Sequence, residues 1–229
     1  MGRFAAKGGE KRLRVTETPG DMASRTIVPL HSRIEEIRQW MEEIDPEPEH
    51  GRQVTRLALM LFDRLAAVHA LTQRERDLLE AAALLHDIGM GISAKRHHKR
   101  SYKLIKEHKF LTWAPEEVDV FALVARYHRK TAPAVRHAAL LSLPERDREV
   151  VRKLAAILRV ADGLDRAHLS TIQEIDVECD ARTIRMKLHA DRDCSSEIWG
   201  AERKARFLEN VFSRQLSIES VDGYRVRPS

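Results

Sequence analysis

The feature that most constrains the fold is an adjacent pair, His86-Asp87, which directly follows the apolar run Leu78-Leu-Glu-Ala-Ala-Ala-Leu-Leu. An imidazole and a carboxylate at the close of a buried helix cost free energy unless a partner satisfies them. Polar groups that converge on one core from several helices are most simply ligands of a divalent metal. Three further polar residues continue apolar stripes of helical period: His50, His128 and Asp162.

The spacing of apolar residues predicts a mainly α protein, with a bundle of about seven helices up to residue 170. Thr72-x-x-Glu75 has the form of a capping box, and Pro48 and Pro115 suit the first turns of two helices. The clearest helices are expected over residues 27–44, 48–65, 72–86, 101–107, 115–128 and 144–162.

After Ser170 the apolar residues alternate with polar ones, which predicts a hairpin, an amphipathic helix around Trp199 and a strand near Leu216. We therefore expect a small C-terminal α+β appendage. The predicted organisation is a flexible basic tail over 1–27, a helical domain over 28–170 and an α+β subdomain over 171–229. Trp40, Trp113 and Trp199 are expected to be core or rim aromatics without a stacking role.

Composition narrows the class of protein. A net charge of +5 and a pI of about 9.4 favour anionic partners such as phosphates, nucleotides, polyphosphate or nucleic acid, and charge alone does not choose among them. The expected partner is a phosphate-containing small molecule or polyphosphate, and nucleic acid is open but unsupported. Cys179 and Cys194 form no C-x-x-C pair, which argues against a disulfide framework or a thiolate zinc site. No apolar stretch is long enough to cross a bilayer and no signal peptide is recognisable, so a cytoplasmic protein without a membrane partner is expected.

A lone histidine on an apolar face is more often a hydrogen-bonded core residue than a metal ligand. Taken together, His50, His86, Asp87 and Asp162 supply the mixed nitrogen and oxygen ligands that suit manganese, magnesium, iron, zinc or nickel, with no basis for choosing among them. A second metal is open, held by His128 with His97 or His98. The competing interpretation is a metal-free scaffold whose polar core residues bond each other.

The order His50, His86-Asp87, Asp162 resembles the HD superfamily of metal-dependent phosphohydrolases. Several blocks are similar, more closely, to the C-terminal HD-like region of the exopolyphosphatase/guanosine pentaphosphate phosphohydrolase (Ppx/GppA) family. They cover the chain from about residue 30 to its end, and lie at 45–55, 81–89, 96–102, 125–130, 159–166 and 198–204. The resemblance implies an HD-type helical bundle with the α+β appendage. The family's actin-like N-terminal domain has no counterpart here, so its chemistry is not carried over.

The resemblance implies a phosphohydrolase that cleaves a phosphate ester or phosphoanhydride, nucleotide or polyphosphate-like, through a metal-activated water, with Asp87 as catalytic residue. The alternative is a non-catalytic polyanion- or nucleotide-binding HD module that works with a separate catalytic protein. Arg100 and Met90 replace a histidine and a lysine common in such sequences. A homodimer is left open. The basic residues expected to contact phosphate are Lys95, Arg96, Lys99, Arg129 and Lys130.

Overall fold

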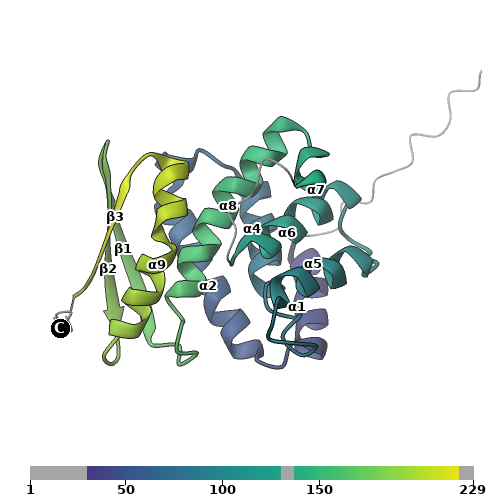
Figure 1. The fold of residues 1–229 in the computed structure, drawn as a ribbon, viewed down its shortest axis with the longest axis horizontal. Coiled ribbons are helices and arrows are strands. Elements are labelled where there is room, and N and C mark those ends of the chain that lie inside the picture. The colour runs from purple at the N-terminus through teal and green to yellow at the C-terminus, as the bar shows by residue number, and fades with distance from the viewer. Residues whose placement is uncertain (1–29, 130–136, 222–229) are drawn as a thin grey trace, which may run out of the picture.

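The computed structural model describes residues 30–129 and 137–221 (Figure 1). Within these ranges eight helices precede a three-stranded sheet, and a ninth helix joins its last two strands. The predicted mainly α class is confirmed. The helices are α1 (Leu30–Ile44), α2 (Pro48–Arg64), α3 (Ala66–His69), α4 (Gln73–Leu84), α5 (His97–Glu107), α6 (Pro115–Tyr127), α7 (Ala138–Leu141), α8 (Glu145–Gly163) and α9 (Ser195–Phe212). The strands are β1 (Ile172–Cys179), β2 (Thr183–Ala190) and β3 (Gln215–Ser220).

Local sequence signals explain where the helices begin. The predicted capping box at the start of α4 is present: the Thr72 backbone N–H donates to Glu75 Oε2 at 2.9 Å, and the Thr72 hydroxyl donates to the same oxygen at 2.6 Å. Pro48 and Pro115 lie in the first turns of α2 and α6, where a missing N–H costs no helical bond.

Two predicted helix bounds were wrong, and both lie beside the site. Helix α4 ends at Leu84 and not at His86, because Leu85 leaves the helical conformation at its C-cap. Helix α5 begins at His97, four residues before the expected Ser101, after Arg96 turns the chain through a left-handed conformation with φ of 65°. His86 and Asp87 therefore lie in a turn between helices.

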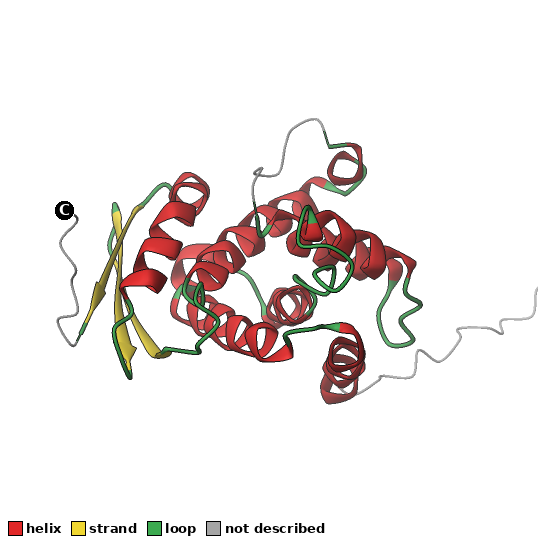
Figure 2. Cartoon of the chain, turned by 60° about the horizontal axis from the view of Figure 1, so that its bottom comes forward, coloured by secondary structure: helices red, strands yellow, loops and turns green. Residues whose placement is uncertain are grey.

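The predicted hairpin and final strand are present. Strands β1 and β2 pair antiparallel, and β3 adds parallel to β2 after the α9 crossover, which gives the order β1-β2-β3. Figures 1 and 2 show α9 between the sheet and α8, so that the sheet forms a layer at one end of the molecule. The expected boundary near residue 170 falls in the loop between α8 and β1. The proposed tail over 1–27 lies outside the described residues.

One hydrophobic core runs from the helices into the sheet, with Leu154, Ile175, Leu188 and Leu208 all fully buried in it. The crossing of α8 and α9 is close because two glycines meet there. A Cβ added at Gly163 would lie 2.6 Å from Ala201 Cα, and one added at Gly200 would lie 2.5 Å from the Gly163 carbonyl oxygen. This crossing brings the end of α8 against α9.

We find no helix in the described part of the chain that combines the length and the apolar character needed to span a bilayer.

Candidate metal centre

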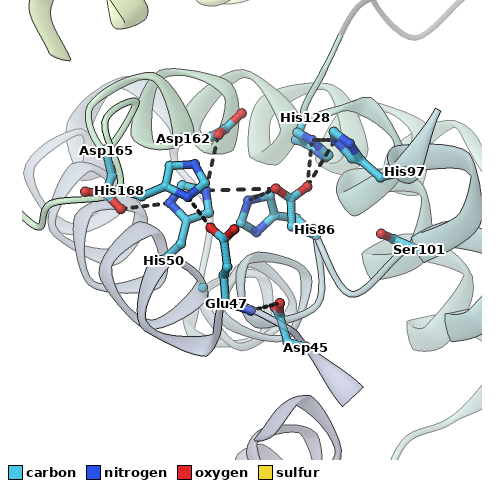
Figure 3. Close-up of polar contacts among 12 residues, drawn as sticks. Asp45, Glu47, His50, His86, His97, Ser101, His128, Asp162, Asp165 and His168 are labelled. Atoms are coloured by element: carbon cyan, nitrogen blue, oxygen red, sulfur yellow. Dashed lines mark hydrogen bonds and ion pairs between the residues drawn. The ribbon is translucent and has the colours of Figure 1, made fainter. Parts of the chain in front are cut away.

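Five segments that are distant in sequence bring their polar side chains to one place (Figure 3). They are the first turn of α2, the turn after α4, the first residue of α5, the end of α6 and the last turn of α8. They carry, in that order, His50, His86 with Asp87, His97, His128 and Asp162. The structure thus brings together all four residues that the sequence predicts for the first metal.

A first group of ligand atoms comes from His50, His86 and Asp87, and these atoms all lie within 4.8 Å of one another. Asp87 Oδ2 is 4.0 Å from His50 Nε2 and 3.7 Å from His86 Nε2. Asp162 lies beside this group, with its Oδ1 3.7 Å from His50 Nε2, while its Oδ2 pairs with the Lys204 ammonium. The sequence analysis did not predict Lys204 of α9 as the partner of Asp162.

A second group consists of Asp87, His97 and His128. Asp87 Oδ1 lies 3.1 Å from His97 Nε2 and 3.4 Å from His128 Nε2, and the two Nε2 atoms are 3.3 Å apart. Asp87 therefore faces both groups, with one carboxylate oxygen toward each. His98, which follows His97 in the chain, is buried as well. The ring centroid of His98 lies 6.3 Å from that of His128, and His98 is not part of this group.

The four histidines share one hydrogen-bonding arrangement. Each donates its Nδ1–H away from the centre: His86 to Ala83 at 2.7 Å, His97 to Ala94 at 3.0 Å and His128 to Ala125 at 2.6 Å, in every case to the carbonyl three residues earlier. His50 donates instead to Asp165 Oδ2 at 2.7 Å. A bond at Nδ1 fixes the tautomer and leaves the Nε2 lone pair toward the centre, as in protein metal sites.

Two residues beside His50 were missed by the sequence analysis. Asp165, which is 1% exposed, binds His50 through Oδ2 and accepts the Ser170 backbone N–H through Oδ1 at 2.9 Å. The ring of His168 stacks on that of His50, with centroids 3.8 Å apart and planes 5° apart. Asp165 lies three residues after Asp162, so helical spacing offered a signal; His168 lies in a loop and offered none.

In the metal-free centre, the pKa values of His50 and His128 shift in opposite directions. Burial opposes protonation of His50, but the hydrogen bond to Asp165 and the nearby carboxylates of Asp162 and Asp87 outweigh it and raise its pKa to about 10. Burial lowers the pKa of His128 to about 3. Burial also opposes ionisation of Asp87, yet the charges of His86 and His128 lower its pKa. At pH 7 the metal-free centre therefore holds Asp87 ionised and His128 neutral, the forms that coordinate a cation, and it holds His50 protonated, so a cation that binds there displaces the proton from His50 Nε2.

A cavity of about 200 Å³ opens onto the centre, and its lining includes Asp87, His97, His128 and Asp162. Arg129, one of the predicted phosphate contacts, lines it, as do Arg166 and Lys204, which were not predicted, and Met90. Three other predicted contacts, Lys95, Arg96 and Lys99, are exposed and are not among its lining residues. Arg100 is exposed too. Lys130 lies outside the described residues.

The fold and this centre define a class: a mainly α-helical protein with a buried histidine–aspartate cluster that opens into a basic cavity. Residues 33–199 match the family described as "Ppx/GppA phosphatase, domain III", and the chain belongs to this family.

The chain is similar to a guanosine-5'-triphosphate,3'-diphosphate pyrophosphatase of Pseudoalteromonas atlantica, with 27% identity over 134 residues. The match covers 56% of this chain and 25% of that relative. The chain thus aligns with about a quarter of the relative's length.

Proposed function

We propose that this chain is a metal-dependent phosphohydrolase of the HD type, acting on a phosphate ester or phosphoanhydride. The observation that carries the proposal is the pair of ligand groups that share Asp87 and face a cavity lined by Arg129, Arg166 and Lys204. The family, described as a phosphatase, and the name of the relative, a pyrophosphatase, support the same reaction class.

The donor set fits a divalent cation. Within the described residues, His50 Nε2, His86 Nε2 and Asp87 Oδ1 are buried without a hydrogen-bond partner. Buried polar atoms are rarely left this way, so their gathering at one centre calls for a ligand. Nitrogen and carboxylate donors without thiolates suit manganese, iron, zinc, nickel or magnesium. We propose that His50, His86, Asp87 and Asp162 hold one cation and that Asp87, His97 and His128 hold a second.

Bound there, a divalent cation supplies Lewis-acid polarisation of a phosphoryl oxygen and a lowered pKa for bound water. The chain's own residues do the remaining work. Arg129 and Lys204 place positive charge along the cavity, where phosphate oxygens gain charge during transfer. Asp87 would hold both cations, with one carboxylate oxygen toward each ligand group, and as an ionised acceptor it would help to orient a water molecule in the cavity. His168 also lines the cavity, and its Nδ1 lies 2.5 Å from Glu47 Oε2. We propose that its imidazole ring donates a proton to the leaving oxygen.

One observation favours a second candidate, a polyanion-binding module without turnover. The Lys204 ammonium pairs with Asp162 Oδ2 and so supplies positive charge at an expected cation ligand. A centre held together in this way binds phosphate without needing a full metal shell.

Metal stoichiometry tests the centre. We expect the purified protein to bind two manganese ions, His86→Ala and His97→Ala to bind about one each, and Asp87→Ala, which removes the shared carboxylate, to bind none. His189→Ala is the matched control, because His189 also bonds a carboxylate, that of Asp176, but lies on the sheet. One ion in the wild type with no effect of His97→Ala would remove the second site.

A phosphate-release panel with manganese tests turnover, using phosphomonoesters, nucleotides and short polyphosphates. We expect hydrolysis by the wild type and by His189→Ala, and a loss of 100-fold or more in Asp87→Ala, on the order of the effect of removing a catalytic group. A wild type that binds metal and hydrolyses nothing in this panel would replace the enzyme proposal with the binding module.

A further inference from the structure

Trp199 lies on α9 beside the cavity and leaves 45% of its surface exposed. Two guanidinium groups lie against its ring: Arg166 Cζ is 4.3 Å from the ring centroid and Arg203 Cζ is 4.7 Å from it. The sequence analysis expected only a core or rim aromatic here. Trp199 lies at the rim of the core, and its ring also contacts the guanidinium groups of Arg166 and Arg203.

Within the described residues neither guanidinium forms a hydrogen bond or an ion pair, and both lie against the Trp199 ring. The contrast with Arg33 is informative. Arg33 also lies over a tryptophan, 4.0 Å from the Trp113 ring, but it donates to the Thr112 carbonyl at 3.1 Å and pairs with a glutamate. That contact is structural. In the Trp199 cluster the N–H edges of both arginines stay available to a ligand.

The cluster is built onto the cavity. Arg166 itself lines the cavity, and so do Gly200 and Lys204, which directly follow Trp199 and Arg203 along α9. A Cβ added at Gly200 would lie 3.0 Å from Cβ and Cδ of Arg166. The glycine thus leaves room for the arginine stem to cross α9 and reach the tryptophan ring.

We propose that Arg166, Trp199 and Arg203 form a subsite for the phosphate group adjacent to the one that reacts. The inference rests on the proposed function for the position of the reacting phosphate, and it assigns these three side chains to binding of the next phosphate along the substrate. A guanidinium stacked on an aromatic ring keeps its donors free for bidentate bonds to phosphate. The ring also restricts the long side chain in advance, which lowers the entropy lost on binding.

Calorimetric titration of the purified protein at constant free manganese tests the subsite. The probes are imidodiphosphate, a non-hydrolysable diphosphate, and inorganic phosphate. We expect Arg166→Ala and Arg203→Ala each to weaken imidodiphosphate binding about tenfold, the worth of one charge-assisted bond, and to change phosphate binding less than about twofold. Trp199→Ala should behave like the arginine variants, and Trp199→Phe should restore most of the affinity. Arg185→Ala, exposed on the sheet, is the control.

Losses that are equal for both probes, or absent for both, would overturn the subsite. Because the probe is not cleaved, the result is independent of turnover. If the arginine variants lose affinity for imidodiphosphate alone and the wild type hydrolyses nothing, the subsite stands and the enzyme proposal fails. If the wild type hydrolyses a phosphoanhydride and neither arginine variant changes the rate or the binding, the enzyme proposal stands and the subsite fails.

The imido analogue of a nucleoside triphosphate distinguishes the source of the chain. Arginine-dependent binding equal to that of imidodiphosphate supports a subsite that recognises phosphates alone. Tighter binding that still depends on both arginines supports it with a nucleotide as ligand. Binding of the nucleotide analogue without imidodiphosphate would overturn it, because the tryptophan would then serve a base.

Discussion

At the scale of single residues, the centre depends on how each imidazole is held. Three histidines use the carbonyl three residues earlier, and for His86 and His128 that carbonyl belongs to the last turn of a helix, where carbonyls have no following turn to bond. His50 lies in the first turn of α2, where the Glu47 carbonyl three residues earlier accepts the His50 backbone N–H at 3.1 Å, and its ring depends on Asp165, 115 positions later in the chain. The carboxylate makes His50 the ligand most sensitive to a distant substitution.

Replacing Asp165 with Asn should lower metal affinity by about 10–100-fold, because loss of a carboxylate partner leaves a ligating histidine less basic and less well oriented. Metal titration followed by calorimetry measures the change. Asp176→Asn is the matched control: it alters the same kind of pair, with His189 at 2.8 Å, on the exposed sheet. Equal affinities for Asp165→Asn and the wild type would show that His50 is not a ligand.

The pH dependence of the metal-free protein should reveal His50. Its pKa in the folded state, about 10, lies above the ordinary value of 6.5. Its contribution to stability is therefore complete below pH 6.5 and is lost as the pH rises toward 10. We expect the free energy of unfolding of chelator-treated protein to fall over this window, by up to about 1.4 kcal/mol per pH unit.

Urea unfolding at several pH values measures this slope, and His50→Gln, which has no ring to titrate, should lack it. The same slope in both proteins would assign the effect to another group.

At the scale of secondary-structure elements, the crossing of α8 and α9 decides the geometry of the cavity. Asp162 at the end of α8 meets Lys204 on α9 because Gly163 and Gly200 let the two backbones approach. A larger residue at either position separates the helices, and with them the two sides of the cavity.

Gly163→Ala should cost about 1–3 kcal/mol of unfolding free energy, since its Cβ would meet backbone atoms of α9 at 2.6–2.7 Å and backbone cannot yield as a side chain can. Urea unfolding tests this. Gly91→Ala serves as the control, because its Cβ would meet neighbours at 3.7 Å or more and the stability should change little. Similar losses in the two variants would show that the close crossing is not the cause.

At the scale of the whole molecule, the helical part and the C-terminal sheet share a core. Helix α9 packs on α8 on one side and on β3 on the other, and Gln53 of α2 donates to the Ile172 carbonyl at 2.8 Å. The predicted division near residue 170 marks a change of secondary structure. The continuous core indicates that the two parts fold together.

The protein should therefore unfold in a single transition in urea. Trp40 and Trp113 report on the helices and Trp199 reports on α9. Fluorescence of Trp199→Phe, and of a variant with Phe at both 40 and 113, should give the same midpoint as far-UV circular dichroism on each protein. Two separated midpoints would establish residues 28–170 and 171–229 as independent folding units.

Secondary-structure elements that are stabilised by interactions between nearby residues could be predicted from the amino-acid sequence. Helical periodicity and capping residues depend on neighbours within four positions, so the mainly α class, the capping box at Thr72 and the hairpin after residue 170 were predictable. The grouping of His50, His86, Asp87 and Asp162 was expected because His50 and Asp162 continue apolar stripes that face the core and the pair His86-Asp87 directly follows an apolar helix.

The residues that complete the site depend on how the helices pack against one another. Choosing His97 over His98 required the start of α5, which a single left-handed residue sets. Asp165, Lys204 and Arg166 reach the centre from the loop after α8 and from α9, elements placed by the packing of two glycines and a shared core. Contacts between residues more than one hundred positions apart, such as His50 and Asp165, leave no periodic trace in one sequence, because packing and not spacing brings them together.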